Sequence, residues 1–314
     1  MHSVSRRRLL SLATLLPLAA CASSPPASSP GLPPASSPGL PATPSPSPPA
    51  GEAAPTRHDR LVALESKYEA RLGVFAVDTG SGATIAHRAD ERFAFCSTFK
   101  ALAAAAVLAR NPITHLDSRV TYTRDDLMAH APVTERNVRR GMTIRQLCDA
   151  AIRYSDGTAG NLLIRDLGGP AELTAFLRSL GDSVTRMDRL EPDITTAVPG
   201  DPRDTTSPRA IATSYRAVLL GDALSADNRA FLTDLLERNT TGDNRIRAGV
   251  PRGWRVADKT GTGSYGTLND VAIVEPPGAA PIVLGIMSSK PTRNAGRNEK
   301  LLADAAAYVA DTLR

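Results

Sequence analysis

Apolar residues follow a strand-like pattern near both ends of the part of the chain that begins at about residue 60. The turn Thr79-Gly80-Ser81-Gly82 separates the first two predicted strands and indicates a hairpin. The predicted strands cover residues 73–78, 83–87, 256–262, 270–274 and 282–288. Strands at both ends with helices between them imply one sheet assembled from distant parts of the chain.

Between these strands the apolar spacing is helical. The segment 98–110 is so rich in alanine and leucine that it predicts a buried central helix. The predicted helices cover residues 61–72, 98–110, 142–154, 171–180, 208–220, 227–238 and 298–313. We therefore expect an α/β (α+β) fold, with an antiparallel sheet flanked by helices in residues 57–90 and 239–314, and an inserted all-helical domain in residues 91–238. A cleft where the two meet is a natural ligand site.

The first 56 residues have the composition of a targeting segment and a linker. Arg6, Arg7 and Arg8 precede an apolar run at residues 9–20, which predicts a signal peptide over residues 1–20, similar to a twin-arginine signal. Leu18-Ala19-Ala20-Cys21 resembles a lipobox, so Cys21 is the expected lipidation site; an ordinary signal peptide with an incidental cysteine is the alternative. Residues 21–56 are rich in Pro, Ser and Ala and predict a disordered tether. We expect an exported protein, lipid-anchored on the outer or periplasmic side of the cell membrane, with release as an alternative.

Charge and cysteine content exclude several classes of function. The net charge of +5 would fall to +2 after removal of the three arginines of the signal, too little to argue for nucleic acid as a partner. Beyond Cys21 only Cys96 and Cys148 are present, and two cysteines do not make a disulfide framework. We expect no disulfide and a structural role for Cys96 as a small buried residue.

Candidate chemistry begins with Ser97-Thr98-Phe99-Lys100, at the start of the alanine-rich helix. Three residues along a helix bring two side chains to one face, so the Lys100 amine should meet the Ser97 hydroxyl. A neighbouring amine can act as a base for a serine nucleophile, and a helix N-terminus favours developing negative charge. The chain has only five lysines, which gives this motif weight.

Two further triplets contain polar side chains suited to a site. Ser155-Asp156-Gly157 follows a predicted helix, and Lys259-Thr260-Gly261, continued by Thr262, lies on a predicted strand. A lysine among hydroxyls and glycines at a sheet edge suits the docking of a substrate carboxylate. Either triplet alone is more often an ordinary turn than a site.

The three motifs in this order resemble those of class A β-lactamases and penicillin-binding proteins. The resemblance extends from about residue 60 to the C-terminus and implies a β-lactamase/transpeptidase-like fold. Arg189-Leu190-Glu191-Pro192, followed by Asp204, resembles the omega loop of class A enzymes, in which a glutamate holds the hydrolytic water and an Arg–Asp ion pair closes the loop. That loop separates the lactamases from the transpeptidases.

The resemblance implies a role for each matching residue. Ser97 would attack the lactam carbonyl, with Lys100 or Glu191, or both, as base, and Glu191 would then activate water to release the product. Ser155 would protonate the lactam nitrogen. The backbone N–H groups of Ser97 and Thr262 would form the oxyanion hole. The remaining expected substrate-binding residues are Lys259, Thr260, Gly261, Thr262 and Arg245; Arg245 is similar to the arginine that class A enzymes supply from the strand beside Lys-Thr-Gly.

Four positions depart from the common pattern of the family. Gly157 stands where most members have asparagine, as in the mycobacterial-type enzymes, and implies a roomier site. Thr195 stands where an asparagine usually helps to fix the hydrolytic water, and a threonine hydroxyl has a shorter reach. His130 occupies the gate position, which is often aromatic. Gly263 replaces the cysteine that pairs with the equivalent of Cys96 in some carbapenem-hydrolysing relatives, which excludes that disulfide.

The function expected from the resemblance is a serine β-lactamase, a hydrolase acting on cyclic amides, that opens penicillins and cephalosporins and gives antibiotic resistance. We expect a monomer with a small β-lactam substrate, no cofactor and no metal, a membrane contact through the N-terminal anchor, and no nucleic-acid partner. A D-alanyl-D-alanine peptidase would share the three motifs but lack the glutamate loop. A lactam-sensing lipoprotein would be acylated once without turnover, and a solute-binding lipoprotein would explain the tether alone.

Overall fold

The computed structural model describes residues 58–314, and its centre is one antiparallel sheet. The strands are β1 (Arg71–Asp78), β2 (Thr84–His87), β7 (Arg255–Thr262), β8 (Leu268–Glu275) and β9 (Ile282–Ser289). Their order is β2-β1-β9-β8-β7, and β1 pairs with β9 along its whole length. The expected sheet, built from both chain ends, is confirmed.

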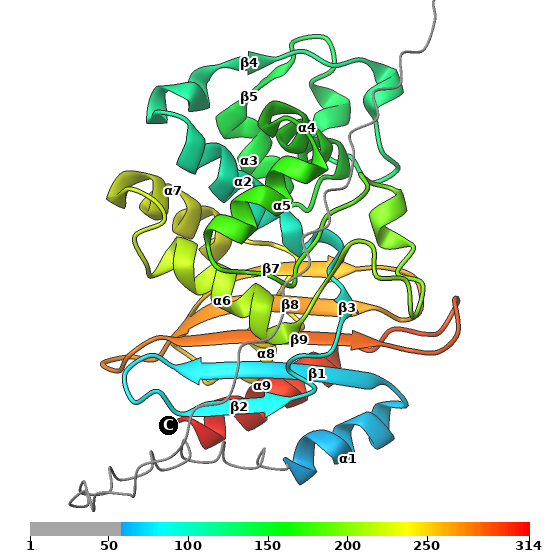
Figure 1. The fold of residues 1–314 in the computed structure, drawn as a ribbon, viewed down its shortest axis with the longest axis vertical. Coiled ribbons are helices and arrows are strands. Elements are labelled where there is room, and N and C mark those ends of the chain that lie inside the picture. Colours follow the sequence, from blue (N-terminus) through cyan, green and yellow to red (C-terminus); the bar gives the residue numbers. More distant parts are fainter. Residues whose placement is uncertain (1–57) are drawn as a thin grey trace, which may run out of the picture. The chain divides into compact units, whose positions relative to one another are not determined.

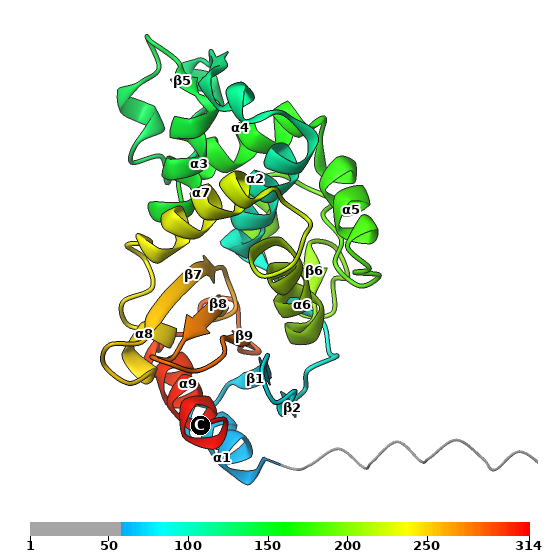
Figure 2. The same ribbon diagram turned by 90° about the vertical axis from the view of Figure 1, so that its left-hand side faces the viewer.

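Helices cover both faces of this sheet (Figure 1, Figure 2). One face packs against α1 (Asp59–Tyr68), α8 (Ile246–Gly249) and α9 (Lys300–Thr312), and the other packs against α6 (Pro208–Leu219). Strand β1 alternates between the two: Val74 and Ala76 belong to the core under α1 and α9, whereas Phe75 and Val77 belong to the core on the other side. The sheet is therefore buried on both faces.

The helical part is organised around α2 (Phe99–Arg110), whose first ten residues are buried. It contacts α3 (Ile144–Arg153), α4 (Gly157–Leu167), α5 (Pro170–Ser179), α6 and α7 (Ala226–Glu237). The small alanine side chains allow this many helices to approach closely. The predicted buried central helix is confirmed.

Short elements connect these helices. The two-residue strands β3 (Phe93–Ala94) and β6 (Thr205–Thr206) pair with each other, as do β4 (Arg119–Val120) and β5 (Met142–Thr143). The 3₁₀ turns are η1 (Cys96–Thr98), η2 (Ile113–Asp117), η3 (Arg124–Asp126), η4 (Thr134–Arg136) and η5 (Asp193–Thr195).

Two helix predictions require correction. The helix expected over 61–72 ends at Tyr68, because Glu69 adopts a left-handed conformation (φ 49°) and the Glu65 carboxylate accepts the backbone N–H of Leu72, at 2.8 Å. The helix expected from residue 142 begins at Ile144, since Thr143 caps it by accepting the N–H of Gln146.

Helix α4 was not predicted at all. Its N-terminal signal is Asp156, whose side chain accepts the N–H of Ala159 at 2.9 Å, and its C-terminal signal is Gly168 at φ 106°. The glycines at its start, Gly157 and Gly160, weaken the helical pattern, and tertiary packing overrides that preference.

The described residues, 58–314, cluster as one compact unit, so the division at residues 90/91 and 238/239 stays a prediction. Within residues 58–314 the helices are too short or too polar to cross a membrane. The predicted signal peptide, the Cys21 lipidation site and the tether lie outside the described residues.

Candidate active site

Ser97 lies in the 3₁₀ turn η1, immediately before α2. Asn269 of strand β8 anchors the segment before this turn: its buried side-chain amide donates to the carbonyl oxygens of Ala94, at 2.8 Å, and Phe95, at 3.1 Å. Tyr215 of α6 donates to the carbonyl oxygen of Thr98, at 2.7 Å. These buried hydrogen bonds fix the nucleophile candidate to the sheet and to α6.

Lys100 is fully buried one helical turn beyond Ser97, and its amine lies at the centre of the site. The Nζ atom is 3.0 Å from Ser97 Oγ, 2.7 Å from Glu191 Oε1 and 2.7 Å from the carbonyl oxygen of Ser155. Ser97 Oγ itself is 3.2 Å from Glu191 Oε1. Hydroxyl, amine and carboxylate therefore form one hydrogen-bonded triangle, built from two distant parts of the chain.

Glu191 is held in place by the omega loop, which we define as residues 189–206. The expected ion pair is present: Arg189 Nε lies 2.6 Å from Asp204 Oδ2, and the buried Asp204 also accepts the backbone N–H groups of Asp188 and Arg189. Asn161 of α4 binds Glu191 twice, since its Oδ1 accepts the backbone N–H of Glu191 and its Nδ2 donates to the carbonyl, both at 3.0 Å. No sequence motif had pointed to Asn161.

Ser155 and Lys259 face each other across the site. Ser155 adopts a left-handed conformation (φ 55°), and its Oγ accepts a hydrogen bond from Lys259 Nζ at 3.1 Å. Asp156 is fully buried and fixes this turn by accepting four hydrogen bonds from backbone and hydroxyl groups of neighbouring loops and α4. Burial, reinforced by the nearby Lys100 charge, lowers the pKa of Lys259 to about 7.

Strand β7 is an edge of the sheet, and its open side contributes to the site. The N–H of Gly263 donates to Thr267 across the β7–β8 turn, so the alternation of an antiparallel ladder directs the N–H of Thr262 to the open edge. The hydroxyl of Thr260 is 2.5 Å from that of Thr241, which sequence reasoning had missed.

Arg245 reaches the same edge from an unexpected position. It does not lie on a strand: it immediately precedes the short helix α8. Its guanidinium donates to the carbonyl oxygens of Gly261 and Asn269 and to Thr262 Oγ1, at 2.9, 2.8 and 2.9 Å, and forms an ion pair with Glu299 at 2.9 Å. These contacts need only the end of a long side chain, so the backbone can lie outside the sheet.

The departures from the family pattern have specific surroundings. A Cβ atom at Gly157 would collide with Glu191 Oε2, so the carboxylate itself fills part of the space that the missing side chain leaves. The Thr195 hydroxyl donates to the carbonyl of Pro192 at 2.7 Å, which commits its only proton within the loop. His130 is exposed at the mouth of the site, with Nε2 3.0 Å from the carbonyl oxygen of Tyr154.

Cys96 and Cys148 are free thiols, both fully buried. Burial raises the pKa of each to about 12, which keeps the thiols protonated and unreactive. A Cβ atom at Gly263 would lie 2.7 Å from Cys96 Sγ, so the two positions are neighbours.

A cavity of about 520 Å³ joins these groups. Its walls include Ser97, Ser155, Glu191, Thr195, His130, Arg245, Thr260 and Thr262 from the predicted set, and Met128, Thr241, Gly263 and Arg297 beyond it. Arg297 donates to the carbonyl of Gly263 at 2.9 Å. Its position so far along the chain from the other motifs gave no sequence signal. A serine hydroxyl linked to an amine and a carboxylate is typical of enzymes with a serine nucleophile.

Comparison with known proteins agrees with this assignment. The model of the β-lactamase enzyme family matches residues 56–313. A β-lactamase of Mycobacterium tuberculosis (strain H37Ra) is 56% identical over 261 residues, which cover 81% of this chain and 85% of the relative. The structure of a β-lactamase from Streptomyces albus G has a TM-score of 0.79 and 50% identity, and covers 82% of this chain and 98% of its own. The structure of a class A β-lactamase from Clostridium kluyveri has a TM-score of 0.80 and 46% identity, and covers 81% of this chain and 97% of its own.

The chain therefore belongs to the β-lactamase enzyme family, among the class A serine enzymes, which are hydrolases. The predicted family and fold are confirmed, including the likeness to the mycobacterial members.

Proposed function

We propose that this chain hydrolyses the β-lactam amide of penicillins and cephalosporins through an acyl-enzyme on Ser97. The observation that carries the proposal is the triangle in which Ser97 Oγ lies 3.0 Å from Lys100 Nζ and 3.2 Å from Glu191 Oε1. Both groups can accept the hydroxyl proton, directly or through a water, as the Oγ–C bond forms. Opening of the lactam in this way gives antibiotic resistance.

Ser155 supplies the proton for the departing nitrogen. Its hydroxyl is hydrogen-bonded to Lys259 at 3.1 Å, and Ser155 lines the same cavity as the nucleophile Ser97. As the lactam C–N bond breaks, the nitrogen takes this proton and the acyl group stays on Ser97. The outward N–H of Thr262 and that of Ser97 bind the oxyanion, each donor contributing about 3 kcal/mol.

The substrate carboxylate binds at the edge of β7. The hydroxyls of Thr260 and Thr262 and the guanidinium of Arg245 line the cavity there, and the buried Lys259 amine lies behind them, bonded to Ser155 and to the Thr260 carbonyl. The absent side chain at Gly261 lets the substrate approach the backbone closely. Charge-assisted hydrogen bonds of this kind fix the orientation of the lactam. His130 also lines this cavity.

Deacylation requires Glu191 to activate a water against the ester on Ser97. The water oxygen bonds to the acyl carbon, and the bond between that carbon and Ser97 Oγ breaks. The product leaves as an acid, and Ser97 Oγ regains a proton from the water through Glu191. The carboxylate is close enough to bind a water beside Ser97, and it is fixed by Asn161 and by the Arg189–Asp204 ion pair. This second half-reaction separates a lactamase from a peptidase or sensor that shares the acylation machinery.

The decisive experiment compares the wild-type chain with Glu191→Ala. Nitrocefin should be turned over many times by the wild type, whereas the variant should accumulate an acyl-enzyme visible as a mass increase of one lactam. Ser97→Ala is the control and should show no adduct. A wild type that is acylated once without turnover would favour a sensor, and normal turnover by Glu191→Ala would remove the carboxylate from its proposed role.

We also propose export, lipidation of Cys21 and a monomeric state, supported by the N-terminal sequence pattern and by the small, self-contained cavity. Labelled palmitate should be incorporated by cells that express the chain, and Cys21→Ala should abolish the label and release activity into the medium. Light scattering should give the mass of one chain. Unchanged labelling of the variant, or a dimer mass, would contradict these assignments.

A further inference from the structure

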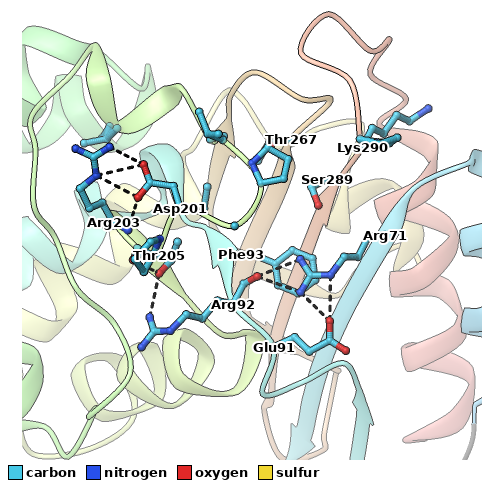
Figure 3. A pocket seen from close by; sticks show the side chains of 18 of the residues that line it. Arg71, Glu91, Arg92, Phe93, Asp201, Arg203, Thr205, Thr267, Ser289 and Lys290 are labelled. Atoms are coloured by element: carbon cyan, nitrogen blue, oxygen red, sulfur yellow. Dashed lines mark hydrogen bonds and ion pairs between the residues drawn. The ribbon is translucent and has the colours of Figure 1, made fainter.

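A second cavity, separate from the active-site cavity, is lined by residues of the omega loop (Figure 3). Its volume is about 610 Å³, larger than that of the active-site cavity. Its walls are omega-loop residues, Phe93 and Ala94 of β3, Arg71 at the start of β1, and the chain leaving β9. Within residues 58–314 the two cavities have no lining residue in common, so a ligand here would not compete directly with substrate.

Cationic side chains outnumber carboxylates among the residues that line this cavity. The cations are Arg71, Arg92, Arg189, Arg203 and Lys290, against Glu91 and Asp201. Arg71 pairs with Glu91, and Arg203 with Asp201, both at 2.7 Å, as Figure 3 shows.

Two of the cations keep an uncompensated charge. Arg92 donates to neutral acceptors, the carbonyl of Val184 at 3.0 Å and the hydroxyl of Thr205 at 2.9 Å. The Lys290 ammonium, at the rim, has no hydrogen bond or ion pair with any described residue. A wall with surplus positive charge and a free ammonium attracts an anion.

The remaining lining is apolar. It comes from Phe93, Ala94, Ile194, Ala197, Val198, Pro199, Pro202 and Pro291. Val198 is 46% exposed, although isoleucine and valine side chains elsewhere in the chain are mostly buried. Apolar walls around a few charged groups are typical of small-molecule sites.

We propose that this cavity binds a small organic anion, with an apolar body against Val198 and the neighbouring prolines and a carboxylate or phosphate group toward the Lys290 ammonium at the rim. The bound molecule would contact the segment that follows Glu191, which is itself joined to the β7–β8 turn by the hydrogen bond from Ser264 N–H to the Thr195 carbonyl at 2.9 Å. Occupancy therefore restrains the omega loop, and through it the rate of deacylation. Binding of the anion does not depend on the proposed function. Only the effect on the deacylation rate rests on that function.

Calorimetric titration of the chain with four probes tests the ligand class. The probes are 4-phenylbutyrate, its neutral amide, phenyl phosphate and inorganic phosphate. We expect the two aryl anions to bind at least about tenfold more tightly than either the amide or inorganic phosphate. The amide lacks the negative charge, and inorganic phosphate lacks the apolar group. Equal binding of the amide would overturn the role of charge, and equal binding of inorganic phosphate would overturn the apolar role. Tighter binding of the carboxylate or of the phosphate would identify the preferred head group.

Variants locate the site. Lys290→Glu should weaken 4-phenylbutyrate binding about tenfold or more, whereas Arg252→Glu, an exposed change of the same charge, should leave it unchanged. Arg245→Gln should not affect binding, and inhibition of nitrocefin hydrolysis should be noncompetitive. Loss of binding in Arg245→Gln, or purely competitive inhibition, would place the anion in the active site and overturn the proposal. Nitrocefin turnover without any probe tests the proposed function separately.

Discussion

Asn161 makes both hydrogen bonds that join α4 to the backbone of Glu191, and its replacement by alanine should slow deacylation selectively. The side chain is 9% exposed, and its two bonds are each 3.0 Å long. At a net contribution of about 1 kcal/mol per bond, Asn161→Ala loses about 2 kcal/mol of loop positioning. If the whole loss is expressed in the transition state for deacylation, the rate falls about 30-fold.

Stopped-flow kinetics separates the two half-reactions. Wild type should show steady turnover of nitrocefin, whereas Asn161→Ala should show a burst of about one equivalent followed by a slow phase. Acylation itself should change little, because Ser97 and Lys100 are anchored by η1 and α2 rather than by α4.

Asn228 provides a matched control. It is a helical asparagine, 7% exposed, whose amide donates at 2.9 Å to the carbonyl oxygen of Leu108, on the far side of α2 from the nucleophile. Asn228→Ala should lower the free energy of unfolding by about 1 kcal/mol with no burst. A wild-type deacylation rate in Asn161→Ala, or an equal burst in Asn228→Ala, would refute the argument from loop positioning.

Three further predictions concern charge. Because the pKa of Lys259 is lowered to about 7, the free enzyme loses this positive charge above about pH 7. The value of kcat/KM for a lactam with a carboxylate should therefore decline about tenfold from pH 7 to 9. Lys259→Arg should remove this decline. Arg189→Ala leaves the buried Asp204 without its cation and should cost about 3 kcal/mol, or roughly 6–12 °C in Tm by calorimetry, while Arg203→Ala, in an exposed pair, should change Tm little. Arg245→Gln should raise KM about tenfold for lactams that carry the carboxylate and hardly at all for an ester of the same lactam; equal effects on both would indicate a purely structural role.

Much of the fold could be read from local patterns. The strands of the sheet and the buried helix α2 have spacings that only one kind of element can satisfy, because a side chain on a strand or helix reaches the core at a fixed period. Helix α4 was missed for a related reason: its first turn is Gly157-Thr158-Ala159-Gly160, which lacks an apolar stripe, and its ends are defined by Asp156 and Gly168.

Spacing also placed Ser97 near Lys100, since one helical turn separates them. It could place neither Asn161 beside Glu191 nor Arg297 at the carbonyl of Gly263. Those contacts join segments 30 and 34 residues apart through different elements, and no short-range period encodes such a distance.

The sequence by itself determined the family and the fold class and suggested the proposed reacting groups, because these depend on residue identity and on periods within single elements. Only the tertiary structure decided that Arg245 reaches the site from outside the sheet, that Glu191 fills the space beside Gly157, and that surplus positive charge gathers beside the omega loop. The physical reason is that each of these depends on where separate segments pack, and packing is set by the whole core at once.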